Sequence, residues 1–154
     1  MPHQAYKNWK EVLNNMEKEK TYKSGQMVKD KYGVERLRMT GSEVAQAYSW
    51  GMRDFSGTDL SHAYLAKTDL SGARFSEADL TATSFVKSDL KDADFRGSIV
   101  KGACFECADL SRAFFRERDI IGKGRPYGSL GGAFIELAEK SELYRYGLAG
   151  MFLD

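Results

Sequence analysis

The chain has 154 residues and a formal net charge of +1, with 23 Lys and Arg against 22 Asp and Glu. This length suits one domain with extensions, and the near-neutral charge excludes a global field that would attract nucleic acid or membrane. Because no apolar run approaches membrane-spanning length, no signal-peptide core follows Met1 and only two cysteines are present, we expect a cytoplasmic protein without membrane contact.

The first predicted element is an amphipathic helix over residues 4–20, inside an N-terminal extension of residues 1–40. Its apolar residues recur at helical spacing, and the opposite side is rich in Lys and Glu. These apolar residues are Tyr6, Trp9, Leu13 and Met16. Residues 21–39 are compatible with either a short hairpin or an irregular wrap, and both alternatives stay open.

A second helix is predicted to follow Thr40. Thr40 and Glu43 have the spacing of a capping box, in which the side chain of each residue bonds to the backbone of the other. The helix would run from Glu43 to Trp50 and end at Gly51. We expect residues 41–53 to cover the open N-terminal end of the segment that follows.

That segment has an uninterrupted five-residue period. Every fifth residue from 55 to 120 is a large apolar one, and a small residue lies two positions before most of them. The series is Phe55, Leu60, Leu65, Leu70, Phe75, Leu80, Phe85, Leu90, Phe95, Val100, Phe105, Leu110, Phe115 and Ile120. A period of five fits neither a helix nor an ordinary strand, so it indicates a repeat architecture whose short units stack on one another.

The side chains also indicate how many units make one coil. If a coil has four units, residues twenty apart are stacked, and one column then contains Phe55, Phe75, Phe95 and Phe115. The other columns are similarly uniform, as a stack of like layers requires. A ten-residue period gives a comparable alternation, so this pattern supports the four-unit coil without deciding it.

Several units resemble the A-(D/N)-(L/F)-x-x unit of pentapeptide-repeat proteins: Thr68–Leu70, Ala78–Leu80, Ala93–Phe95 and Ala108–Leu110. The resemblance covers residues 53–120. It implies a mainly β solenoid, a right-handed four-sided β-helix, which would occupy residues 54–121 with about 3.5 coils. Residues 43–55 resemble the entry helix that often precedes such repeats.

Residues 122–154 are predicted to form a C-terminal helical cap and an apolar tail. A glycine-rich stretch from Gly122 to Gly128 breaks the repeat, and a helix is expected from about Gly132 to Tyr146. The apolar tail includes Met151, Phe152 and Leu153, which would cover the last coil, contact a second copy in a homodimer, or do both.

The sequence shows little that could support catalysis. Cys104 and Cys107 form a single C-x-x-C, but the residues expected to stack on Cys104 in a four-unit coil are Ser84 and Gly124, which are poor zinc ligands. His62 is expected on the surface without nucleophile or carboxylate partners. We therefore predict no catalytic residue, no metal and no cofactor.

Two surfaces are candidates for binding. An acidic ladder is expected where Asp69, Asp89 and Asp109 stack on one face, although Asp at this position also bonds turn amides and so has a structural explanation. A second face, which has Leu65, Phe85 and Phe105 on its inner side, carries the fewest charged residues on its outer side. The candidate protein-interaction residues on this face are Tyr64 and Val86, which would either bind a partner or be covered by the N-terminal extension. Ile99 and Phe114 are further candidates, because they occupy positions where Asp is usual and would mark where another segment or a subunit packs.

The first functional hypothesis is a non-catalytic, rigid module that binds another protein or a second copy of itself. The alternative is a DNA-mimicking modulator of a DNA-binding enzyme such as a type II topoisomerase (gyrase), because some pentapeptide-repeat proteins resemble B-form DNA in shape and charge. A third hypothesis, direct nucleic-acid binding by residues 7–38, is disfavoured because residues 1–53 carry only ten Lys and Arg against six Asp and Glu.

Overall fold

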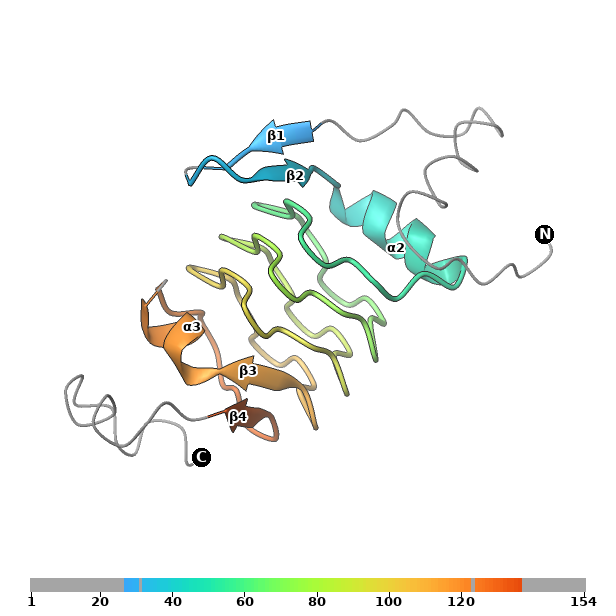
Figure 1. The fold of residues 1–154 in the computed structure, drawn as a ribbon. Helices are drawn as coiled ribbons and strands as arrows, with labels where there is room; N and C mark the ends of the chain where they lie inside the picture. Colours follow the sequence, from blue (N-terminus) through green and yellow to red (C-terminus); the bar gives the residue numbers. More distant parts are fainter. Residues whose placement is uncertain (1–26, 31, 123, 137–154) are drawn as a thin grey trace.

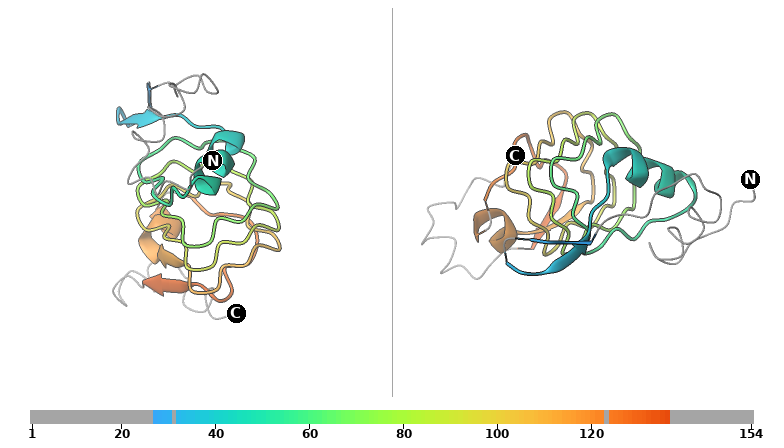
Figure 2. Two further views of the ribbon diagram at one scale, coloured as in Figure 1. Left: turned by 90° about the vertical axis from the view of Figure 1, so that its right-hand side faces the viewer. Right: turned by 90° about the horizontal axis from the view of Figure 1, so that it is seen from above.

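A stack of four-sided coils forms the body of the molecule (Figure 1). The computed structural model describes residues 27–30, 32–122 and 124–136. In chain order the regular elements are β1 (Met27–Lys29), β2 (Glu35–Leu37), α2 (Gly41–Ser49), β3 (Phe114–Arg116), α3 (Glu117–Gly122) and β4 (Phe134–Glu136). Between α2 and β3 the chain winds through the coils, which Figure 2 shows as loops stacked along one direction.

Backbone pairing shows that one coil contains four five-residue units. Parallel bridges join residues twenty positions apart, for example Asp59 to Asp79 and Ser84 to Cys104. The amide of Leu60 donates to the carbonyl of Asp79 at 2.8 Å, and the amide of Asp79 donates to the carbonyl of Thr58 at 2.8 Å. The β-helix is therefore held by hydrogen bonds between coils, and the four-unit period predicted from the sequence is confirmed.

The apolar member of every unit points into the coils. All fourteen are buried, and none exceeds 3% exposure. Phenylalanines of one column stack with their neighbours in the next coil: the ring centroids of Phe75 and Phe95 are 5.4 Å apart, and those of Phe85 and Phe105 are 5.2 Å apart. Between columns the rings meet edge to face, as Phe85 and Phe95 do at 80°. These geometries are the ones that aromatic pairs prefer.

Small residues fill the remaining interior space. Ala73, Ala78 and Ala93 are completely buried, because a narrow coil has no room for a second large side chain in each unit. Where a hydroxyl occupies this position it is hydrogen-bonded: Thr58 donates to the carbonyl of Phe55 at 2.7 Å, and Ser98 donates to the carbonyl of Phe95 at 2.6 Å. These polar side chains thus avoid the free-energy penalty of an unsatisfied buried hydroxyl.

Each unit ends in a tight turn that requires a left-handed residue. The amide of Ala63 donates to the carbonyl of Leu60, and His62 within this turn has a φ of 61°. The same position has a positive φ in every unit from Gly57 to Arg112, although most of these residues are not glycine. Stacking on neighbouring coils therefore imposes a backbone conformation that most of these side chains disfavour.

The N-terminal end of the stack is covered by α2 (Figures 1 and 2). Thr40 caps this helix, its hydroxyl accepts from the amide of Glu43, and the Glu43 carboxylate accepts from the amide of Thr40. Val44 and Ala47 are fully buried against the first coil. The predicted capping box is confirmed, and α2 begins at Gly41 and ends at Ser49, where the sequence predicted a helix from Glu43 to Trp50.

Residues 27–37 form a hairpin, which decides between the two alternatives for part of residues 21–39. β1 and β2 pair antiparallel, with Met27 opposite Leu37. Asp30 organises the turn: its carboxylate accepts from the amides of Tyr32 and Val34, and from Nε of Arg36 at 2.9 Å. The hydrogen bond from Arg36 is the main reason that the pKa of Asp30 lies below its usual value.

The repeat is interrupted, but not ended, at the C-terminal side. Cys104 pairs with Tyr127, a spacing of 23 residues, while α3 occupies part of the intervening chain. The period then recovers, because β4 pairs in parallel with β3 and places Phe134 beside Phe114. The helix predicted to begin at Gly132 is therefore wrong for residues 134–136, which form a strand because they extend the ladder. The rest of that predicted helix, the helix over residues 4–20 and the tail at Met151, Phe152 and Leu153 lie outside the described residues.

Candidate interaction surfaces

Side chains at the middle of each unit point outward and form four columns, one on each face of the coil. We number the faces in chain order. Face one contains Asp54, Arg74, Asp94, Phe114 and Phe134. Face two contains Arg38, Asp59, Asp79 and Ile99. Face three contains Tyr64, Ser84, Cys104 and Tyr127. Face four contains Asp69, Asp89 and Asp109.

The outward aspartates have a structural role in their own turns. The carboxylate of Asp69 accepts from the amide of Ser71 at 3.0 Å and from the hydroxyl of the same residue at 2.9 Å. Asp109 makes the equivalent pair of bonds with Ser111. Bonds of this kind fix the turn that starts each new face. The structural explanation for the repeated Asp is thus sufficient by itself.

Face four contains the predicted acidic ladder, and a cation neutralises part of it. Nζ of Lys91 lies 3.3 Å from Oδ2 of Asp89 and 3.6 Å from Oδ2 of Asp109, so it bridges two coils. Hydrogen bonds from Ser111 and the charge of Lys91 lower the pKa of Asp109. At the N-terminal end of the ladder, the amide of Ser71 is the largest cause of the lowered pKa of Asp69.

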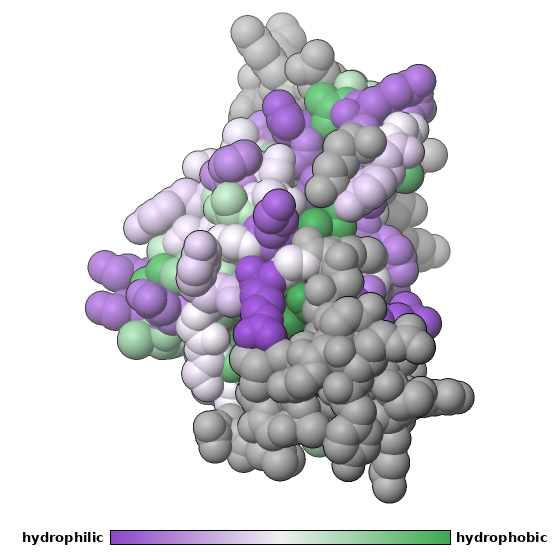
Figure 3. Space-filling view, turned by 90° about the vertical axis from the view of Figure 1, so that its left-hand side faces the viewer, coloured by the Kyte–Doolittle hydropathy of each residue, from purple (hydrophilic) through white to green (hydrophobic). Residues whose placement is uncertain are grey.

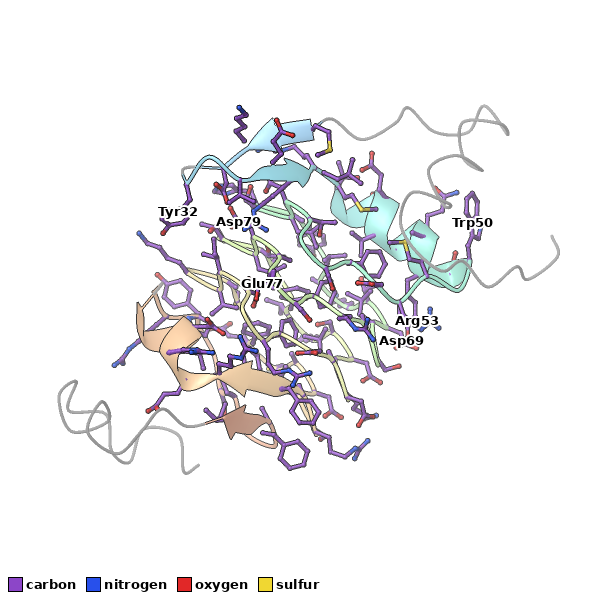
Figure 4. All side chains as sticks on the ribbon, in the orientation of Figure 1. Tyr32, Trp50, Arg53, Asp69, Glu77 and Asp79 are labelled. Carbon is purple, nitrogen blue, oxygen red and sulfur yellow. The ribbon has the colours of Figure 1, made fainter. Side chains whose placement is uncertain are left out.

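Arg53 contributes a positive charge close to Asp69, below the C-terminal end of α2 (Figure 4). Its guanidinium carbon lies 3.6 Å from the ring centroid of Tyr48, and its Nη1 atom donates to the carbonyl of Tyr48 at 2.9 Å. The Tyr48 hydroxyl in turn donates to the carbonyl of Ser71 at 2.7 Å. Cations therefore accompany the acidic ladder at both of its ends.

Most charged side chains in the columns of faces one and two form ion pairs with other residues of the same chain. Arg96 makes a two-pronged contact with Asp94, at 2.9 and 2.7 Å, and the Nη2 atom of Arg38 lies 3.0 Å from Asp59. Face two additionally carries the hairpin: Arg38 pairs with Asp59, and a side-chain nitrogen of Arg36 donates to the backbone carbonyl of Glu77 in the next coil. On the side of the molecule where the hairpin tip and α3 lie, hydrophilic and hydrophobic residues are interspersed (Figure 3).

Face three differs from the other faces because none of its four column residues is charged. Tyr64 is 72% exposed and Tyr127 is 66% exposed, at the two ends of the column. Ser84 and Cys104 lie between them and are half-buried, as is Val86 at the adjoining corner. Tyr64 and Val86 were predicted as binding residues. Tyr127 was missed, because the three-residue shift that brings it over Cys104 has no recognisable signal in the sequence.

The other two predicted binding residues lie in different surroundings. Ile99 is only 4% exposed, so it is not part of a binding surface. Its apolar side chain replaces the usual Asp because the position is buried. Phe114 is 41% exposed on face one, where its ring centroid lies 5.2 Å from that of Phe134 and 5.4 Å from the guanidinium carbon of Arg96.

Cys104 lies in the column of face three, Cys107 lies in the turn that follows it, and His62 is exposed in an earlier turn. Cys104 has Tyr127 as its neighbour in the last coil, not Gly124 as predicted. Both cysteines are free thiols, and Cys107 is exposed in a turn. Within the part of the chain that the structure describes, no three His, Cys, Asp or Glu side chains are grouped so that they could hold a metal ion. In the same part of the chain, no helix has the length and apolar character needed to cross a membrane.

Comparison with known proteins identifies the repeat. The family model for pentapeptide repeats matches residues 54–92 and 73–112, with eight copies. No curated protein sequence matches the chain. Similar solved structures include a pentapeptide repeat protein from the thylakoid lumen of Arabidopsis thaliana, with 24% identity and a TM-score of 0.41, covering 60% of this chain and 70% of that one.

Another similar structure is HetL of the cyanobacterium Nostoc sp. strain PCC 7120, a pentapeptide repeat protein involved in the regulation of heterocyst differentiation. It is 22% identical with a TM-score of 0.41, and the match covers 52% of this chain and 37% of HetL. A further pentapeptide repeat protein from Nostoc PCC 7120 is 22% identical with a TM-score of 0.31, covering 62% of this chain and 95% of that protein.

Proposed function

We propose that this protein, whose residues 54–112 match the family model for pentapeptide repeats, is a non-catalytic module that binds another protein through face three. One observation supports this proposal most directly. Faces two and four carry the hairpin, ion pairs or turn-forming aspartates, and on face one the guanidinium of Arg96 lies 5.4 Å from the ring of Phe114. Face three displays two widely exposed tyrosines on an uncharged column.

Tyrosine suits such a role because it offers a large contact area with a polar end, and it loses little conformational entropy on binding. Ser84 and Cys104, which lie between Tyr64 and Tyr127, have small, half-buried side chains. The column spans three ladder steps, or roughly 14 Å. Hydrogen bonds between coils hold it rigid, so that binding does not require the backbone to become ordered.

DNA mimicry is less well supported. It would rely on Asp69, Asp89 and Asp109, but Lys91 bridges two of these residues, and all three carboxylates accept hydrogen bonds from their own turns. A surface that imitates a phosphate backbone needs uncompensated negative charge.

Affinity capture from the native host tests the proposal. The bait is the full chain, compared with a Tyr64→Ser, Val86→Ser, Tyr127→Ser variant. We expect specific partners to be lost with the triple variant and kept with Arg74→Ser, a control at an exposed position on face one. If the same proteins are recovered at equal yield with the triple variant, face three is not the binding surface.

A further inference from the structure

We infer that the partner of face three is an acidic protein segment that also carries apolar or aromatic residues. This inference rests on the proposed function and specifies its partner. The argument comes from the charges at the two corners that border the tyrosine column, together with the uncharged character of the column and its two exposed aromatic rings.

Two lysines stack at the corner that follows face three. The amide of Lys67 donates to the carbonyl of Val86 at 2.8 Å, and the amide of Lys87 donates to the carbonyl of Glu106 at 2.9 Å. These bonds place Lys67 and Lys87 at equivalent positions in consecutive coils, about 4.8 Å apart along the stack. Both side chains are exposed.

Neither lysine forms an ion pair with another residue that the structure describes. By contrast, Lys91, Arg96 and Arg112 on other parts of the coil each contact a carboxylate. Lys101, at the opposite corner of face three, is likewise exposed and makes no ion pair with a described residue. Glu106 is the opposing acidic residue at these corners, so the margins of face three are positive overall.

An acidic segment would neutralise these lysines while its apolar side chains cover the tyrosines. Such complementarity improves the rate and selectivity of association. A helix of about nine residues would span the roughly 14 Å between Tyr64 and Tyr127. A nucleic acid fits less well, because strong binding to DNA uses about 6–10 phosphate contacts and this face offers few unpaired cations.

The test is a selection of random dodecapeptides displayed on phage, with the full chain as the target. Enriched peptides are then synthesised, and their affinities are measured by fluorescence anisotropy at low and high salt. We expect the selected peptides to be net negative and to contain aromatic or aliphatic residues. With Lys67→Glu, Lys87→Glu as the target, their binding should weaken about three- to tenfold, and a new selection should favour net-positive peptides.

The exchange of charge is compatible with the backbone, because Glu77 already has a φ of 58° at the equivalent turn position. Lys91→Glu is the matched control on face four and should leave peptide affinity unchanged. The Tyr64→Ser, Tyr127→Ser variant separates the two proposals: it should reduce affinity at least tenfold if the peptides bind face three.

If the selected peptides bind the tyrosine variant more weakly but have no preferred net charge, face three remains the binding surface and the acidic partner is overturned. Peptides unaffected by the tyrosine variant would overturn both proposals. Tighter binding of a single-stranded oligonucleotide than of any selected peptide, with loss in the lysine variant, would replace the protein partner by a nucleic acid.

Discussion

Gly41 lies directly against the backbone of Tyr64: a Cβ atom on this glycine would be 1.9 Å from the Tyr64 carbonyl oxygen. The start of α2 therefore packs on the first coil at a distance that only glycine permits. This contact joins the cap helix to face three.

We expect Gly41→Ala to destabilise the protein by about 1–3 kcal/mol, because backbone atoms cannot move away as a flexible side chain would. In an isolated helix the same change would be favourable by about 1 kcal/mol. Urea unfolding measures the effect, with the neighbouring exposed Ser42→Ala as control. A Gly41→Ala protein as stable as the control would show that the cap does not pack this closely.

Phe95 is the centre of the aromatic core. Its ring contacts those of Phe75, Phe85, Phe105 and Phe115, with centroid separations from 4.7 to 5.9 Å. We expect Phe95→Ala to reduce the unfolding free energy by about 3–5 kcal/mol, because it removes all four contacts and leaves a cavity. Phe114→Ala, at an exposed ring, should cost much less. Similar losses for both variants in urea unfolding would contradict this assignment of the core.

The turn positions offer a reciprocal pair of substitutions. Ala82 has a φ of 55° and Gly72 a φ of 69° at equivalent places in different units. Ala82→Gly removes a strain of about 1–2 kcal/mol, partly offset by greater freedom of the unfolded chain, and should stabilise slightly. Gly72→Ala should destabilise by about 1 kcal/mol. Thermal unfolding should give a higher midpoint temperature for Ala82→Gly and a lower one for Gly72→Ala. Midpoint shifts in the same direction would contradict the strain argument.

The acidic ladder should make stability depend on pH. The pKa values of Asp69 and Asp109 are lower in the folded protein than in the unfolded chain, so the unfolded chain binds more protons in acid. This contribution is complete above the unfolded pKa of about 3.9 and disappears as the pH falls through the folded values. Asp109→Asn keeps an oxygen that can accept from Ser111 but loses the charge.

Urea unfolding at a series of pH values should therefore show a smaller acid-induced loss of stability in Asp109→Asn than in the unaltered protein. Ser42→Ala, a change at an exposed residue without a titratable side chain, provides the control and should leave the pH profile unchanged. An identical profile for Asp109→Asn would mean that this carboxylate is not stabilised by folding.

A supercoiling assay distinguishes protein binding from DNA mimicry. We expect no effect of the full chain on type II topoisomerase at micromolar excess, because Lys91 compensates the ladder on face four. Lys91→Ala removes that compensation and serves as a sensitised variant. Inhibition by the unaltered chain that increases in Lys91→Ala would favour mimicry over the proposed function.

The five-residue period was sufficient to predict the coil, since Phe55 to Ile120 are buried as the pattern requires. It also located Tyr64 and Val86 on the least charged face. Tyr127 could not be placed, because α3 inserts residues between equivalent positions and composition does not indicate how many. Ile99 was predicted to lie where another segment or a subunit packs, because an apolar residue replaces the usual Asp, but the repeat could not tell which of the two would cover it; in the structure Ile99 is buried. Residues 134–136 were assigned to a helix because Phe134, Leu137 and Ala138 have helical spacing, whereas in the structure residues 134–136 pair with β3 as a strand.

The spacing of the bridges also bears on how such a chain can change in length. Equivalent residues recur every twenty positions. Deleting any twenty consecutive residues from the middle of the stack would therefore join two residues that occupy equivalent positions on the same face. The cap helix and the final strand would be left intact, and each face would lose a single rung. Insertions or deletions of twenty residues would therefore lengthen or shorten the protein by one coil at a time, and the distance between Tyr64 and Tyr127 would change by one coil each time.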